Sequence, residues 1–176
     1  MKTLYLVRHA KSSWDNPDWD DFERPLNERG LRSAPKMARY LVNKGIKPQQ
    51  MVSSPAARAL STAHMFAAVM GYPANNILQV PAIYNSNSNQ LFDILRQLDD
   101  TQDSIMLFGH DTSITVVTED LSNQRFLHFP TCGVAGLKLN INSWADVKEG
   151  CGELEFFYFP KGIADELKLS KKAPGA

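Results

Sequence analysis

The chain has 176 residues, of which 43% are hydrophobic and 22% are charged. This length predicts one globular domain with a substantial core, and the sequence has no apolar run long enough for a membrane span. The 19 basic and 19 acidic side chains balance to a formal net charge of zero, which argues against a general binder of nucleic acids or membrane surfaces.

The first residues and the cysteines indicate the cellular setting. Met1 and Lys2 run directly into strand-like sequence, so we expect no signal peptide. Cys132 and Cys151 lack the spacing of metal ligands, and two thiols form no disulfide framework. We therefore expect a soluble protein in a reduced, cytoplasmic setting, with neither a metal nor another cofactor.

Segments typical of strands and helices alternate along the chain. In chain order we expect a strand over residues 2–7, a helix from a cap at Asn27 to residue 43, a strand over 51–53, a helix over 56–70, a strand over 77–80, a helix over 89–98, a strand over 104–108 and a helix from 111 to about 121. Two antiparallel strands follow over residues 134–139 and 154–159, and residues 169–176 form a frayed tail. This order predicts a single α/β domain whose sheet is mostly parallel.

The helix that follows Asn27 carries two specific predictions. Its apolar side chains are expected to share one buried face, which comprises Leu31, Ala34, Ala38, Leu41 and Val42. Pro35 lies inside this helix, so we expect either a kink or a later start. Gly45 stands just beyond the expected end, which is typical of helix termini.

Basic side chains follow the buried strands at the point where each strand ends. Arg8 and His9 come directly after the first strand, and His110 follows the strand over residues 104–108. Arg58 stands in the first turn of the helix after the strand over residues 51–53. Each residue alone is as consistent with a structural role, at a solvated strand end or in a turn, as with a functional site. Because ligands bind at the carboxyl ends of parallel strands, we nevertheless expect the four side chains to gather at one edge of the sheet.

Such a cluster of cationic side chains is typical of an anion site. Arginine makes bidentate contacts with a phosphoryl group, and helix N-termini add free N–H donors. Histidine adds a nitrogen that is nucleophilic near neutral pH. No Asp or Glu occurs between Arg29 and Phe92, so this part of the chain supplies no carboxylate that would act as a general acid.

Four sequence segments resemble the motifs of a known family. The segment RHAKSSW is similar to the RHG signature of the histidine phosphatase superfamily, with Ala10 in place of glycine, and SSPAARALSTA and FGHDTSI are similar to its second and third motifs. The segment DDFERPLNERG resembles the short, phosphohistidine-phosphatase-like branch. The resemblance covers residues 1–161 as one domain, leaves residues 162–176 as a C-terminal tail, and implies a three-layer α/β/α sandwich like that of phosphoglycerate mutase.

The resemblance also implies a role for each matching residue. His9 would be the nucleophile that becomes phosphorylated, and Arg8, Arg58 and His110 would bind the phosphoryl group and stabilise its transition state. Three further residues are expected to bind substrate, namely Ser12, Asp15 and Arg24. Asp15 stands where the family commonly has Asn, and an acid there would repel phosphate unless it is protonated or turned away.

These roles lead to an expected function with two alternatives. We expect a phosphatase that hydrolyses a phosphomonoester or phosphoramidate, with protein phosphohistidine as the favoured substrate. The first alternative is a broad-specificity phosphatase for small phosphorylated molecules, and the second is a non-catalytic phosphate-binding module.

The general acid and the shape of the site are less determined by the motifs. Candidate acids lie mostly between His9 and the segment RPLN, and they are Asp18, Asp20, Asp21, Glu23 and, beside His110, Asp111. Asp21 ranks first, although it is also placed to pair with Arg24. The polar loop YNSNSN over residues 84–89 predicts a shallow, open site or, alternatively, a simple connector.

Overall fold

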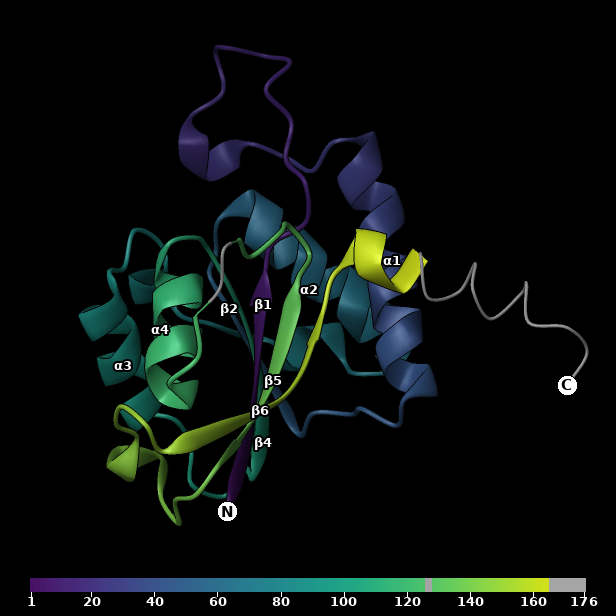
Figure 1. The fold of residues 1–176 in the computed structure, drawn as a ribbon. Coiled ribbons are helices and arrows are strands. Elements are labelled where there is room, and N and C mark those ends of the chain that lie inside the picture. Colours follow the sequence, from purple (N-terminus) through teal and green to yellow (C-terminus); the bar gives the residue numbers. More distant parts are fainter. Residues whose placement is uncertain (126–127, 165–176) are drawn as a thin grey trace, which may run out of the picture.

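A six-stranded sheet forms the centre of the computed structural model, which describes residues 1–125 and 128–164 (Figure 1). The strand order is β3-β2-β4-β1-β5-β6. The bounds are Lys2–Arg8 for β1, Gln50–Ser53 for β2, Leu78–Gln79 for β3, Ser104–Gly109 for β4, Val134–Leu139 for β5 and Gly152–Tyr158 for β6. Strands β1 to β4 pair in parallel, whereas β5 and β6 are antiparallel. The predictions of an α/β fold and of antiparallel closing strands are confirmed.

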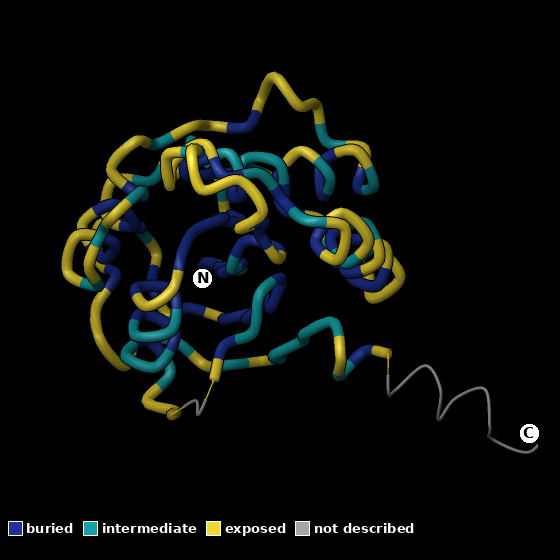
Figure 2. The backbone as a smooth tube through the Cα atoms, turned by 90° about the horizontal axis from the view of Figure 1, so that it is seen from above, coloured by how far each residue is buried: buried dark blue, intermediate teal, exposed yellow. Residues whose placement is uncertain are grey.

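Helices cover both faces of the sheet and complete three layers. Helices α1 (Glu28–Asn43) and α2 (Ala57–Met70) pack on one face, and α3 (Ser88–Arg96) and α4 (Ser113–Ser122) pack on the other (Figure 1). Two clusters of buried apolar side chains fill the spaces between these layers. Seen from above, the central strands β1, β2, β4 and β5 are mostly buried, and the helices have an exposed outer side (Figure 2).

Helix α1 corrects two details of the sequence analysis. The Asn27 side chain accepts a hydrogen bond from the Gly30 N–H, so the predicted cap is confirmed. The helix begins at Glu28 and passes through Pro35, and the expected later start is therefore wrong. Leu31 is 48% exposed rather than buried. The buried stripe instead follows residues 30, 34, 37, 38 and 41, and a helix turns Leu31 about 100° away from Gly30.

The remaining elements differ from prediction mainly at their ends. Strand β3 and helix α3 are shorter than expected, and α4 begins at Ser113. Residues 160–164 are helical, while the predicted frayed tail over 169–176 lies outside the described residues. In the described part of the chain, no helix is long and apolar enough to cross a membrane.

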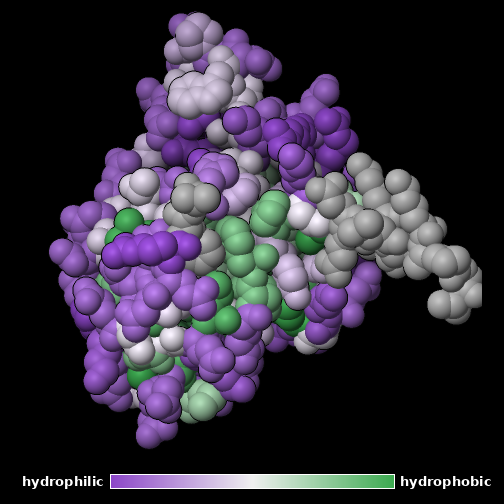
Figure 3. Space-filling model, in the orientation of Figure 1, coloured by the Kyte–Doolittle hydropathy of each residue, from purple (hydrophilic) through white to green (hydrophobic). Residues whose placement is uncertain are grey.

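The edge strand β6 carries aromatic side chains that are only partly covered. Phe156 stacks on Tyr158 with ring centroids 4.5 Å apart and on Tyr5 of β1 at 6.1 Å. Figure 3 shows apolar surface over this region of β5 and β6, between more hydrophilic helical surfaces. The opposite edge of the sheet ends in the two-residue strand β3.

Candidate active site

The four predicted residues meet at the carboxyl end of the sheet. Arg8 is the last residue of β1 and lies opposite Gly109 of β4, so His9 and His110 follow neighbouring parallel strands. Their ring centroids are 5.4 Å apart. Arg58 reaches the same place from the first turn of α2. The side chains of His9, Arg58 and His110 are largely buried, which limits the access of water to their charges.

His9 is held as a neutral imidazole with a defined tautomer. Its Nδ1 lies 2.7 Å from the carbonyl oxygen of Ala10. A carbonyl only accepts hydrogen bonds, so Nδ1 carries the proton and Nε2 keeps its lone pair. The pKa of His9 is lowered to about 3, mainly by burial and also by the neighbouring His110, Arg58 and Arg8, against the opposing effect of the hydrogen bond to Ala10. The ring is therefore a competent nucleophile at neutral pH.

His110 is also neutral in the free protein. Its Nε2 lies 2.9 Å from Ser54 Oγ, which already accepts a hydrogen bond from the Ala56 N–H. Ser54 Oγ has one proton and a second lone pair, so it donates to Nε2 in one tautomer of the ring and accepts from Nε2 in the other. Burial and the charge of Arg58 lower the pKa of His110 to about 4. A bound phosphoryl anion would act in the opposite direction and raise this pKa.

The site contains several buried donors that lack a protein partner. Arg8 Nη1 donates to the Phe129 carbonyl oxygen at 2.8 Å, and both Nη atoms of Arg58 contact Asp21. Among the described residues, Arg8 Nε, Arg58 Nε and His110 Nδ1 are buried and have no hydrogen-bond partner. Unpaired buried donors are costly and uncommon in folded proteins. Two such donors on neighbouring guanidinium groups, with the unpartnered His110 nitrogen beside them, indicate a site for an anion.

Thr62 of α2 is a site residue that the sequence analysis missed. Its buried hydroxyl accepts a hydrogen bond from the Ala10 N–H at 3.0 Å and donates to the Arg58 carbonyl oxygen at 2.7 Å. It therefore ties the segment after His9 to the helix that carries Arg58. The one available signal is its position four residues after Arg58, where a threonine hydroxyl reaches back to the helix carbonyl.

Two of the three predicted substrate-binding residues join a network beside these four. Ser12 is buried and its Oγ accepts a hydrogen bond from Arg24 Nη1 at 2.6 Å. Arg24 also contacts Asp21 and stacks on Trp14, with its guanidinium carbon 3.6 Å from the ring centroid. Asp15 is exposed, and its backbone N–H donates to the side chain of Ser13. Its role in substrate binding stays a prediction.

Asp21 is the acidic residue at the centre of this network. The hydroxyl of Tyr84 donates to Asp21 Oδ2 at 2.7 Å, and Arg58 and Arg24 contact the same carboxylate at 3.0 and 3.2 Å. These hydrogen bonds, with that of Tyr84 first, lower the pKa of Asp21 to about 2. The expected pairing of Asp21 with Arg24 is confirmed, and an ionised Asp21 is a poor general acid at neutral pH.

Tyr84 shows that the loop over residues 84–89 is more than a connector. Its ring makes edge contacts with Phe22 and His110, at centroid distances of 5.1 and 5.7 Å. The polarity of this loop is visible in the sequence, whereas nothing in the sequence marks the tyrosine as a site residue. Among the described residues, no group of three or more His, Cys, Asp and Glu side chains is placed to hold a metal ion.

Comparisons with known proteins agree with this geometry. A family model described as the histidine phosphatase superfamily (branch 1) matches residues 4–78. An uncharacterised chloroplastic protein of Arabidopsis thaliana is 32% identical over 153 residues, which cover 82% of this chain and 70% of that protein.

Two solved structures share the fold over nearly their whole length. A protein of Agrobacterium tumefaciens, proposed to be the phosphohistidine phosphatase SixA, superposes with a TM-score of 0.75 and 26% identity over 90% of this chain and 98% of its own. The protein histidine phosphatase SixA in complex with tungstate has a TM-score of 0.78 and 18% identity, over 92% of this chain and 99% of that one.

Proposed function

Because the chain belongs to the histidine phosphatase superfamily and is a phosphatase, we propose that it hydrolyses protein phosphohistidine through a covalent intermediate on His9. The observation that carries this proposal is the state of His9. Its Nδ1–H is bound to the Ala10 carbonyl, its Nε2 is unprotonated, and Arg8, Arg58 and His110 lie close enough to lower its pKa.

The proposed mechanism has two displacement steps. His9 Nε2 attacks phosphorus in line, and the leaving group departs on the opposite side. Arg8, Arg58 and His110 stabilise the negative charge that spreads over the equatorial oxygens. Water then attacks the phosphohistidine of the enzyme, releases inorganic phosphate and restores His9.

The substrate class follows from the protonation state of the site. Release of an alkoxide from an alkyl phosphate needs a general acid, whereas the imidazole of phosphohistidine leaves more readily. Asp21 is ionised because its pKa is about 2. A broad phosphatase for small alkyl phosphates would therefore lack its acid at this position. The non-catalytic alternative is disfavoured because His9, Arg8 and Arg58 are all present and lie close together.

The extent and location of the enzyme are part of the same proposal. We assign the phosphatase domain to residues 1–161, with residues 162–176 as a C-terminal tail. The partner is then a phosphorylated protein in the cytoplasm. The match to a chloroplastic relative makes cell fractionation the direct check of this location.

The nucleophile is tested by trapping the intermediate. Brief incubation with radiolabelled substrate, followed by denaturing electrophoresis without acid, should leave acid-labile, base-stable label on the wild-type protein. His9→Ala should abolish this label, while the matched variant His64→Ala, on the exposed side of α2, should keep it. Alanine at Arg8, Arg58 or His110 should lower turnover about a hundredfold or more. Label that persists on His9→Ala would show that another residue is the nucleophile.

A further inference from the structure

A carboxylate beside a phosphoryl site requires an explanation. Asp21 lies in the short helix η1 (Asp21–Glu23), at the end of the sheet where the strands β1, β2 and β4 terminate (Figure 1). Two like charges in one site repel each other, so an ionised Asp21 opposes phosphate binding. Five hydrogen bonds nevertheless hold this residue in place, from Tyr84 Oη, two nitrogens of Arg58 and two of Arg24.

The position of Asp21 relates it to the leaving group rather than to the phosphoryl oxygens. His9 stands at the buried end of β1, and an in-line displacement sends the leaving group away from it. The ring centroids of His9 and His110 are 5.4 Å apart, and those of His110 and Tyr84 are 5.7 Å apart. The Tyr84 hydroxyl in turn lies 2.7 Å from Asp21 Oδ2. The Asp21 side chain is 50% exposed whereas His9 is 7% exposed, so the carboxylate lies nearer to solvent than the nucleophile, on the side from which a protein substrate approaches.

The surroundings of Asp21 suit a flat ring that carries an N–H group. Its side chain is 50% exposed, and among the described residues the Tyr84 hydroxyl is the one uncharged donor to its carboxylate, so an incoming N–H group can take the place of that hydroxyl. The aromatic rings of Tyr84 and Phe22 meet edge to face next to it, at a centroid distance of 5.1 Å. An imidazole can stack on such rings while its free nitrogen donates a hydrogen bond to the carboxylate.

We propose that Asp21 selects phosphohistidine by accepting a hydrogen bond from the unphosphorylated ring nitrogen of the substrate in its protonated form. This inference rests on the proposed function. In the first step the bond from His9 Nε2 to phosphorus forms, and the phosphorus–nitrogen bond breaks. Its electron pair goes to the substrate ring, which keeps the proton on its other nitrogen and leaves as neutral imidazole. The substrate thus brings its own proton, and the enzyme needs no general acid.

The test compares two substrates on matched variants. Phosphohistidine peptide has the ring N–H, and p-nitrophenyl phosphate lacks it. Asp21→Asn should lower kcat/KM for the peptide at least about tenfold more than for the aryl phosphate, because a charged acceptor is replaced by a neutral amide. The control variant Glu28→Gln, whose side chain is 93% exposed, should change neither value by more than about twofold.

The pH profile separates this role from a purely structural one. The fall of kcat at high pH reports the loss of the ring proton in the enzyme–substrate complex. With phosphohistidine peptide this fall should occur at lower pH in Asp21→Asn than in the wild type, because the carboxylate stabilises the protonated ring. If Asp21 only holds Arg58 in place, Asp21→Asn should lower kcat/KM equally for both substrates and leave the pH profile of kcat unchanged. That result would overturn the inference but not the proposed function.

A wild-type measurement covers the case in which Asp21→Asn does not fold. A phosphohistidine peptide methylated on the second ring nitrogen remains cationic but has no N–H. Its kcat/KM should be at least about tenfold below that of the unmethylated peptide. Equal values would overturn the inference. If the wild type hydrolyses p-nitrophenyl phosphate but not phosphohistidine, the proposed substrate itself is wrong, and the inference fails with it.

Discussion

Two neighbouring histidines, His9 and His110, make the stability of the protein depend on pH at the scale of single residues. Burial holds their pKa values at about 3 and about 4, whereas an unfolded histidine has a pKa of about 6.5. Between these values the unfolded chain binds more protons than the folded one. The free energy of unfolding therefore rises with pH across this window and is diminished as pH falls below about 6.5.

We predict that the thermal midpoint falls steadily as the pH is lowered from 7 to 4. Each histidine contributes a slope of up to about 1.4 kcal/mol per pH unit. His9→Asn and His110→Asn should each reduce this slope, as measured by thermal melts at a series of pH values. His64→Asn should leave it unchanged, because that side chain is exposed. If neither His9→Asn nor His110→Asn alters the slope, other titratable groups cause the pH dependence of stability.

At the scale of elements, the first turn of α1 supports the segment that follows His9. A Cβ atom added at Gly30 would lie only 2.2 Å from the Lys11 carbonyl oxygen. That same oxygen accepts a hydrogen bond from the Asn27 N–H at 3.0 Å. The helix and the segment therefore approach so closely that only glycine fits at position 30.

We predict that Gly30→Ala destabilises the protein although alanine is the better helix former. The propensity gain is about 1 kcal/mol, but the clash involves backbone and costs about 1–3 kcal/mol or more. The displaced segment also carries Ser12, so kcat/KM should fall as well. Denaturant unfolding and turnover assays test this, with Ser33→Ala on the same helix as the control. Unchanged stability in Gly30→Ala would mean that the segment around Lys11 can shift away from the added methyl group without an energetic cost.

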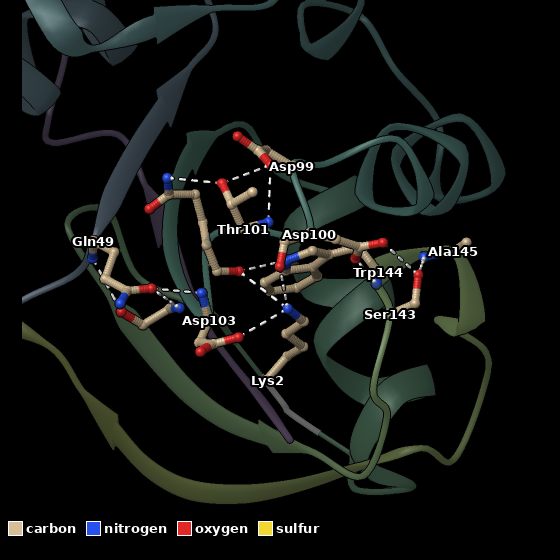
Figure 4. Close-up of polar contacts among 11 residues, drawn as sticks. Lys2, Gln49, Asp99, Asp100, Thr101, Asp103, Ser143, Trp144 and Ala145 are labelled. Carbon is tan, nitrogen blue, oxygen red and sulfur yellow. Dashed lines mark hydrogen bonds and ion pairs between the residues drawn. The ribbon is translucent and has the colours of Figure 1, made fainter.

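At the scale of the whole molecule, a second polar cluster closes the opposite end of the sheet (Figure 4). Lys2 is 3% exposed, and its Nζ donates to the Asp100 carbonyl oxygen at 2.8 Å and to Asp103 Oδ1 at 2.9 Å. The backbone N–H of Trp144 donates to Asp100 Oδ1, and the indole N–H donates to the Gln102 carbonyl oxygen. This cluster joins the amino end of β1 to the segments before β4 and after β5.

We predict that Lys2→Met lowers stability and leaves catalysis intact. The change removes the hydrogen bonds that the buried Lys2 ammonium donates, which costs about 1.5–3 kcal/mol, but it lies at the end of β1 away from His9. Lys138→Met, which breaks an exposed pair with Glu155 at 3.7 Å, should change stability by at most about 0.5 kcal/mol. Equilibrium unfolding and kcat on each variant provide the comparison. A loss of kcat in Lys2→Met would show that the two ends of the sheet are coupled.

How far these features follow from the sequence depends on the range of their contacts. Arg8, His9 and His110 are predictable because apolar runs mark the strands and parallel strands bring their ends together. Leu31 was placed on the wrong face because apolar character alone does not decide the rotation of a helix.

Contacts between segments far apart in the sequence are harder to predict than the residues at strand ends. Tyr84 approaches Asp21 across 63 positions of the chain, and Lys2 contacts Asp100 across 98. Neither residue has a periodicity or motif that marks its partner. The further lowering of the Asp21 pKa was only partly predictable, because its largest cause is the hydrogen bond from the distant Tyr84 rather than the pairing with Arg24 nearby in sequence.

The pairing of β1 also governs when the enzyme becomes active during its synthesis. Leu4 of this strand lies opposite Ile105 on one side and Leu137 on the other. The ribosome makes β1 first, but these partners emerge only after most of the described chain, and such distant pairings form slowly. The nascent chain therefore contains His9 long before the sheet that positions this residue has formed, and phosphatase activity begins only after β5 has joined the sheet.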